Sequence, residues 1–112
     1  MSIYYLKRYD TGKNVGPTVL RNADGTVIDL TGCTVNFIAT TAIGATAKIN
    51  AAATVNSPAT AGSVQYSPVA ADVNTAGTFL CEWEITLPST KTLTVPDPGY
   101  DTLQIDADLG LA

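Results

Sequence analysis

Carboxylates are the side chains of this chain best suited to chemistry at neutral pH. The sequence holds 10 acidic residues and no histidine, so the commonest general base and the commonest metal ligand are both missing. Glu82 and Glu84 would share one face of a β-strand, about 6–7 Å apart. A glycosidase acid–base pair can stand at such a distance. Because outward acidic pairs on strands usually serve solvation, we interpret these two as surface residues.

Two further acidic pairs could contribute calcium ligands, Asp106 with Asp108 and Asp97 with Asp101. Neither lies in the dense Asp/Asn/Gly loop that such sites use. Residues 12–16 (G-K-N-V-G) lack the spacing and the Lys-Ser/Thr ending of a phosphate-binding loop. We therefore expect no catalytic residue, no cofactor and no metal site.

Charge is sparse in this chain. Charged residues make up 14% of the sequence, against about 25% in an average soluble domain. Either neighbouring subunits cover part of the surface, or a Thr/Ser/Asn-rich surface keeps the chain soluble. The basic residues are scattered, which argues against nucleic-acid binding. No window approaches the ~20 apolar residues of a membrane span, and the N-terminus does not resemble a signal peptide.

The elements that must position these residues are predicted to be β-strands. The chain shows almost no helical periodicity, and turn signals recur every ~8–12 residues, as in a sandwich or barrel. Alternation is clearest in residues 78–87, where Phe79, Cys81, Trp83 and Ile85 are predicted to face the core. Further strands are predicted at 3–9, 18–21, 26–30, 33–39, 62–66, 93–95 and 100–108.

Turns and the Ala/Thr-rich middle complete the prediction. Asp24-Gly25 predicts a hairpin, because both residue types tolerate positive φ. Residues 40–61 are interpreted as a hairpin turning near Ile43-Gly44, with strand pieces at 48–49 and 53–55, since no apolar stripe at helical spacing appears. Residues 71–77 form a corner with a single helical turn, and the prolines in 96–99 exclude central-strand pairing. We predict one all-β sandwich domain over 1–112, with about seven to nine short strands.

Residues 77–81 (G-T-F-L-C) resemble the G-x-Y-x-C segment on the sixth strand of immunoglobulin domains. The expected fold is therefore an immunoglobulin-like antiparallel β-sandwich. In that family a second-strand cysteine pairs with the sixth-strand cysteine, which would join Cys33 to Cys81. Two departures stand against it: Phe79 lacks the hydroxyl of a tyrosine corner, and Trp83 follows the second cysteine. Because a cytoplasmic protein keeps its thiols reduced, we favour buried free thiols over a disulfide.

The order of motifs resembles a family of bacteriophage virion proteins, the N-terminal immunoglobulin-like domain of baseplate upper proteins. The run D-G-T-V-I-D-L-T-G in 24–32 is its most specific part. The segments that carry the resemblance are 9–12, 24–37, 62–66, 76–79 with 82–85, and 94–96.

This resemblance implies a non-catalytic virion structural protein. It would be made in the host cytoplasm and would act as a tail, baseplate or neck adaptor or a capsid decoration. The implied partners are other virion proteins, with several copies in a symmetric assembly and neither nucleic acid nor membrane among the partners. Two alternatives stay open. One is a carbohydrate-binding or adhesion module that stacks sugars on exposed tyrosines, and the other is a domain of an exported bacterial protein.

Overall fold

The computed structural model describes residues 2–97 and 99–110 of the chain. Within these ranges the chain is built from strands and two short 3₁₀ turns, and it contains no helix long and apolar enough to cross a membrane. The elements are β1 (Ile3–Lys7), β2 (Val15–Val19), β3 (Thr34–Thr40), β4 (Ile49–Ala52), β5 (Thr54–Val55), η1 (Ala59–Ala61), β6 (Ser63–Tyr66), η2 (Ala70–Asp72), β7 (Gly77–Thr86), β8 (Thr92–Val95) and β9 (Asp101–Asp106).

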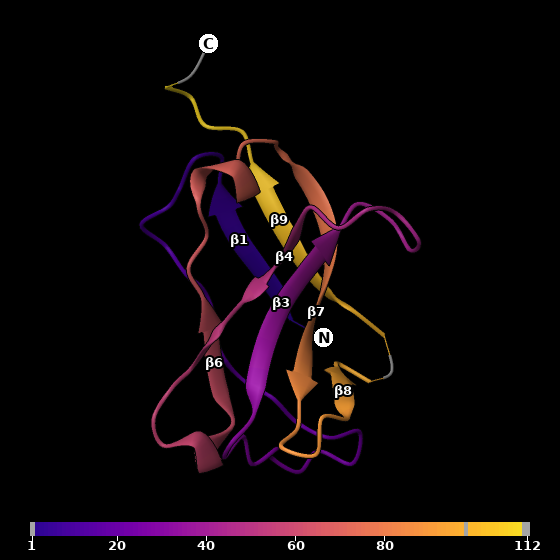
Figure 1. The fold of residues 1–112 in the computed structure, drawn as a ribbon. Coiled ribbons are helices and arrows are strands. Elements are labelled where there is room, and N and C mark those ends of the chain that lie inside the picture. The colour runs from indigo at the N-terminus through magenta and orange to yellow at the C-terminus, as the bar shows by residue number, and fades with distance from the viewer. Residues whose placement is uncertain (1, 98, 111–112) are drawn as a thin grey trace.

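The strands form two sheets, as the sequence predicts. The large sheet has the order β1-β9-β7-β3-β4, with β8 also paired to β7 (Figure 1). The small sheet has the order β2-β6-β5. In this division, β9, β7 and β3 of the large sheet correspond to strands G, F and C of an immunoglobulin sandwich, and β2, β6 and β5 of the small sheet correspond to strands B, E and D. One pairing differs from the expected antiparallel pattern, because β1 runs parallel to β9.

β7 is the central strand of the core. Its alternate residues Phe79, Cys81, Trp83 and Ile85 are all buried, as predicted, and the exposed fraction of Trp83 is 0%. Glu82, Glu84 and Thr86 between them were predicted to face solvent, and each of the three is only partly exposed. Neighbouring strands on both sides cover their backbone and stems.

An aromatic cluster crosses the core from one sheet to the other. Phe37 on β3 lies 4.7 Å from Trp83 between ring centroids and stacks on Tyr66 of β6 at 5.3 Å. Tyr4 on β1 meets Trp83 edge-on at 6.3 Å. Such pairs contribute about 0.5–1.5 kcal/mol beyond their buried area. The cluster therefore fixes how the two sheets sit on each other.

The Ala/Thr-rich middle folds as the predicted hairpin and then changes sheet. β3 and β4 pair antiparallel around a turn in which Ala45 N donates to Ala42 O at 3.1 Å. Only Ala53 separates β4 from β5, yet β5 belongs to the small sheet. This segment therefore carries the chain from one layer of the sandwich to the other.

Residues 18–30 depart from the predicted pair of strands. β2 begins and ends earlier than predicted, and 26–30 forms no strand, only a single bridge between Arg21 and Val27. The turn at Asp24-Gly25 is present, with Gly25 N donating to Asn22 O. Asp24 accepts from both the hydroxyl and the N–H of Thr26, at 2.6 and 3.0 Å. Such local side-chain bonds compete with a strand ladder.

The same pattern of hydrogen bonds recurs five residues later. Asp29 accepts from the hydroxyl and N–H of Thr31 at 2.6 and 3.0 Å. These contacts lower the pKa of both Asp24 and Asp29. The bond from the threonine hydroxyl contributes most, and the bond from the threonine N–H comes second. The segment still contributes to the core, because Ile28 and Leu30 are buried.

The corner before β7 is held by a buried tyrosine–aspartate pair. Tyr66 at the end of β6 donates its hydroxyl proton to Asp72 Oδ2 at 2.6 Å, and Val69 N donates to the same oxygen at 3.0 Å. Asp72 closes η2, the single helical turn expected in this corner. The corner is thus held by a hydroxyl on β6, whereas Phe79 on β7 has none.

The proline-rich segment interrupts the strand that returns along β7. β8 pairs with the second half of β7 and β9 with the first half, so Trp83 lies opposite Val95 and Cys81 opposite Asp101. In a continuous ladder, one residue between Val95 and Asp101 would lie opposite Glu82. Here the segment 96–100 stands in the place of that one residue. The prediction that this segment pairs with no central strand is confirmed for 96, 97 and 99, and Pro98 lies outside the described residues.

Candidate functional site

The carboxylates singled out in the sequence do not converge on one site. Glu82 and Glu84 lie on the outer face of β7, opposite Ile38 and Asn36 of β3. Partial burial raises the pKa of Glu82, with a smaller contribution from the charge of Glu84. Both are partly exposed on this face, in keeping with their interpretation as surface residues.

Three of the four aspartates that could have held calcium, Asp101, Asp106 and Asp108, make other contacts. Asp101 is buried and accepts from Ser2 N at 2.7 Å and from the Tyr4 hydroxyl at 3.3 Å. Asp108 forms an ion pair with Arg8 at 3.1 Å, and Asp106 accepts from Gln104 Nε2. Within 2–97 and 99–110, no group of three or more His, Cys, Asp or Glu side chains could hold a metal ion.

The two cysteines lie at opposite ends of one pair of strands. Cys33 immediately precedes β3, whereas Cys81 on β7 faces Ala39 near the far end of β3. Six residues of strand separate the two positions, or about 20 Å, whereas a disulfide requires Cα atoms about 4.4–6.8 Å apart. The expectation of free thiols is confirmed.

The immunoglobulin pairing of the cysteines is therefore wrong for this chain. That pairing crosses from one sheet to the other, but Cys33 enters β3, the third strand, which is in the same sheet as β7. Cys33 is also only partly buried, and its thiol lies 3.8 Å from Thr31 O. Burial, followed by the charges of Asp101 and Glu82, raises the pKa of the buried Cys81 thiol.

Trp83 forms part of the floor of a small hollow without being exposed in it. The hollow has a volume of about 140 Å³ and lies between β2 and the segment joining β8 to β9. Trp83 Nε1 donates to the Tyr4 hydroxyl at 3.3 Å, which in turn donates to Asp101. Burial is the main reason that the pKa of Tyr4 is raised. This chain of hydrogen bonds satisfies the polar groups at the rim of the core.

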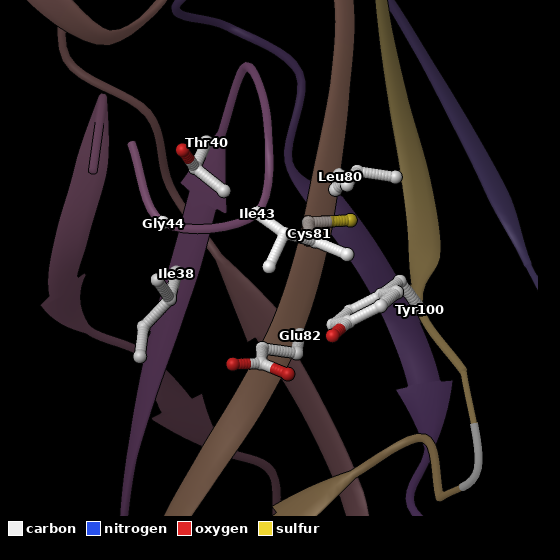
Figure 2. Close-up of a pocket in the computed structure, with 8 residues that line it drawn as sticks. All are labelled: Ile38, Thr40, Ile43, Gly44, Leu80, Cys81, Glu82 and Tyr100. Carbon is white, nitrogen blue, oxygen red and sulfur yellow. The ribbon is translucent and has the colours of Figure 1, made fainter. Parts of the chain in front are cut away.

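A second hollow lies on the outer face of β3 and β7 (Figure 2). Its volume is about 140 Å³. The turn after β3 borders it on one side with Ile43, whose side chain is 73% exposed, and Tyr100 borders it on the other and is 38% exposed. Figure 2 shows these two side chains on either side of β7, with the carboxylate of Glu82 at one end.

The surroundings of this hollow are apolar or uncharged apart from Glu82. The other side chains that border it include Ile38, Thr40 and Leu80. Pockets for small organic ligands usually measure about 300–1,000 Å³. The hollow is thus too small for such a ligand, but it matches a single side chain inserted by a partner protein. We call the surface formed by Ile38, Thr40, Ile43, Leu80, Glu82 and Tyr100 the outer-face site.

Sequence reasoning weighed two residues of this site, Glu82 as a catalytic carboxylate and Tyr100 as one of the tyrosines that could stack on sugar rings, but it did not join them in one site. The sequence places Ile38 only in a strand and Ile43 only in a turn. The available signal was the exposed position of Ile43 at the tip of a predicted hairpin, because large apolar residues are unusual there. Comparison with protein-family models, with curated proteins and with solved structures found no match for this chain.

Proposed function

We propose that this chain is a non-catalytic structural component of a bacteriophage virion that docks on neighbouring virion subunits through its outer-face site. The observation that carries the proposal is the hollow between Ile43 and Tyr100, sized for one side chain and set in a sheet face of low charge. Centres of stable protein interfaces are likewise depleted of charge and enriched in aromatic residues. The resemblance of residues 24–37 and 76–85 to the baseplate domain supplies the class of assembly.

The position within the virion belongs to the same proposal. A tail, baseplate or neck adaptor and a capsid decoration protein all need a rigid small domain with one docking face. The aromatic core and the close pairing of β3, β7 and β9 give that rigidity. On this proposal the chain is made in the host cytoplasm and is carried in the particle in several copies.

The test is incorporation into particles. Particles of the phage that encodes the chain would be purified from an infected culture. The copies of the chain per particle would be counted by quantitative mass spectrometry. We expect several copies per particle for the wild-type chain. Ile43→Asp should reduce incorporation at least about tenfold, because the acid places a desolvated charge in the interface. Absence of the wild-type chain from the particles would refute the proposal.

The matched control is Leu109→Asp. Leu109 is almost fully exposed on the segment after β9, outside the outer-face site. It receives the same change from an aliphatic residue to an acid, and we expect normal incorporation. If both variants enter particles as well as the wild type does, the docking surface lies elsewhere even though the virion role stands.

A carbohydrate-binding or adhesion module is the second candidate. One observation favours it: Tyr5, Tyr9 and Tyr100 are exposed and could stack on sugar rings. Trp83, the best aromatic platform by type, is buried and cannot serve. Binding on a glycan array that is lost in Tyr100→Ala but retained in Ile43→Asp would favour this candidate over the virion proposal.

A further inference from the structure

β1 forms an edge of the large sheet and leaves part of its backbone open. The carbonyl of Ser2 accepts from Thr102 N, and Arg8 N donates to Asp106 O. Even-numbered residues of β1 therefore direct their N–H and C=O groups toward β9. Because these directions alternate along a strand, the odd-numbered residues direct theirs to the other side.

The far end of this edge is closed by a local turn. Lys7 N donates to Asp10 Oδ2 at 3.3 Å, and Asp10 N donates to Lys7 O at 3.0 Å. Ile3 and Tyr5 are then the residues of β1 whose outward backbone groups remain open. Among residues 2–97 and 99–110, no hydrogen bond is recorded to the outward N–H or C=O group of either residue.

The space beside this open edge is only partly filled by β2. A groove of about 300 Å³ runs between residues 2–5 of β1 and the stretch from Lys13 to Thr18. The facing edge, β2, is a poor partner for a strand, because Pro17 has no N–H and the register shifts between Val15 and Thr18. Ile3 and Tyr5 are 54% and 56% exposed, so this edge is apolar and carries unused hydrogen-bonding groups.

We propose that a second copy of this chain occupies the β1 edge, with the two β1 strands antiparallel and Ile3 of each copy opposite Tyr5 of the other. This register is the one in which both open residues of each strand meet open residues of the other. It forms four backbone hydrogen bonds, since each such pair exchanges two. A shift that placed Tyr5 opposite Tyr5 would set Ile3 opposite Lys7, whose backbone groups are already bonded to Asp10.

Side chains and charge fit the same register. Ile3 and Tyr5 both project on the outer face, while Tyr4 and Leu6 turn toward the core. Each copy thus contributes a β-branched residue opposite an aromatic residue, one of the favourable cross-strand pairs. Residues 2–6 carry no charged side chain, so no like charges oppose each other. The large sheets of the two copies would then continue into one another across a two-fold axis.

This inference does not depend on the proposed function, because it uses β1 rather than the outer-face site. The interface is small, so we expect a weak dimer with a dissociation constant of about 1 mM or below, measured by sedimentation velocity from about 10 µM to about 1 mM. Tyr5→Pro should weaken the dimer at least about tenfold, because the substitution removes one N–H donor from each of the two copies. That N–H does not bond β9, so the ladder inside each copy keeps all its bonds.

Tyr5→Thr is the matched control, since it keeps the N–H and places a side chain with high β-propensity at this position, and it should dimerise within a few-fold of the wild type. A wild-type chain that stays monomeric up to about 1 mM would overturn the inference and leave the edge to a strand of another protein. Equal dimerisation of the proline and threonine variants would place the dimer contact elsewhere.

The register is tested by cross-linking, which remains informative if Tyr5→Pro fails to fold. Ile3→Cys and Tyr5→Cys would each be made in a Cys33→Ser background. Residues opposite each other in a hydrogen-bonded antiparallel pair have Cα atoms about 5.5 Å apart, within the range of a disulfide. A mixture of the two variants should cross-link faster than either variant alone. Cross-linking of Tyr5→Cys alone at the higher rate, or none in any sample, would overturn the proposed register.

Discussion

At the scale of single residues, buried polar groups define this protein more than its surface carboxylates do. Tyr66, Asp72 and Asp101 each sit at the edge of the core with hydrogen bonds made. No buried side-chain nitrogen or oxygen in the described part of the chain lacks a partner. Removing one member of such a pair is therefore costlier than removing an exposed polar group.

Tyr66→Phe should lower the free energy of unfolding by about 1–3 kcal/mol. The change removes the hydroxyl that donates to Asp72 and keeps the ring that stacks on Phe37. Urea unfolding measures the effect. Tyr5→Phe is the control, because its exposed hydroxyl has no recorded partner among the described residues, and it should change stability by less than about 0.5 kcal/mol. Similar losses in both variants would contradict the role given to the Tyr66–Asp72 pair.

Stability should fall as the pH rises above about 9. Burial raises the pKa of the Cys81 thiol and the Tyr66 hydroxyl in the folded chain. The unfolded chain therefore loses these protons first, so the contribution to stability is present below the unfolded pKa and disappears above it. In Cys81→Ala the decline between about pH 9 and pH 10 should be shallower by up to about 1.4 kcal/mol per pH unit. An unchanged slope would contradict burial of the thiol.

The two thiols should differ in reactivity. Cys33 is partly exposed and Cys81 is buried, and a thiol reacts as its accessible thiolate. With an aromatic disulfide reagent at pH 8, we expect Cys33 to react in the folded protein and Cys81 only after denaturation. Cys33→Ser should abolish the early phase. If neither thiol could be titrated after denaturation without a reductant, the two cysteines would be joined in a disulfide, which would contradict their separation in the fold.

At the scale of elements, tight turns decide where the strands begin. Gly62 has a φ of +69°, and a Cβ atom added there would lie 2.8 Å from Ile28 O and from Val27 Cγ1. Gly25 has a φ of +89° and open space around it. Both glycines need the left-handed region, but only the first also needs the room that a missing side chain provides. The entry into β6 is thus fixed by contact with 27–28.

Gly62→Ala should therefore cost more than Gly25→Ala. We expect a loss of about 1 kcal/mol at Gly25 from backbone conformation alone and about 2–4 kcal/mol at Gly62, where crowding adds to it. Thermal unfolding of the two variants against the wild type gives the comparison. Equal shifts in Tm would mean that residues 27–28 move aside at little cost.

At the scale of the whole molecule, one core joins both sheets. The aromatic cluster from Tyr4 through Trp83 to Tyr66 crosses the sandwich, and β7 contacts β3, β8 and β9. Trp83 is the single tryptophan of the sequence and is fully buried. Its fluorescence therefore reports on the core that both layers share.

Unfolding should be a single cooperative transition. Small domains with one core commonly unfold in two states, so tryptophan fluorescence and far-ultraviolet circular dichroism should give the same midpoint in urea. Trp83→Phe, followed by circular dichroism, should unfold at lower urea, because it removes the centre of the cluster and the donor to Tyr4. Two separate midpoints in the wild-type chain would contradict the single-domain prediction for 1–112, whose residues 1, 98, 111 and 112 lie outside the described ranges.

Much of the fold was readable from the sequence because it depends on local alternation. The inward positions of β3 and β7, the hairpin near Ile43, the helical turn before β7 and the break at the prolines all follow from residue types at neighbouring positions. The strand predicted at 26–30 failed for a local reason too: Asp24 and Asp29 bind their own turns. The sequence pattern alone does not show whether such bonds or a ladder will form.

The sequence by itself determined that this is a β protein whose core is centred on the strand that bears Trp83, since apolar residues at every second position can be buried on one face alone. Only the tertiary structure decided which strands lie side by side. It placed Cys33 and Cys81 in one sheet, set β1 parallel to β9 with Ile3 and Tyr5 on the open edge, and brought Ile43 to the same face as Tyr100. The physical reason is that alternation is a property of neighbours in the chain, whereas pairing depends on contacts between distant segments.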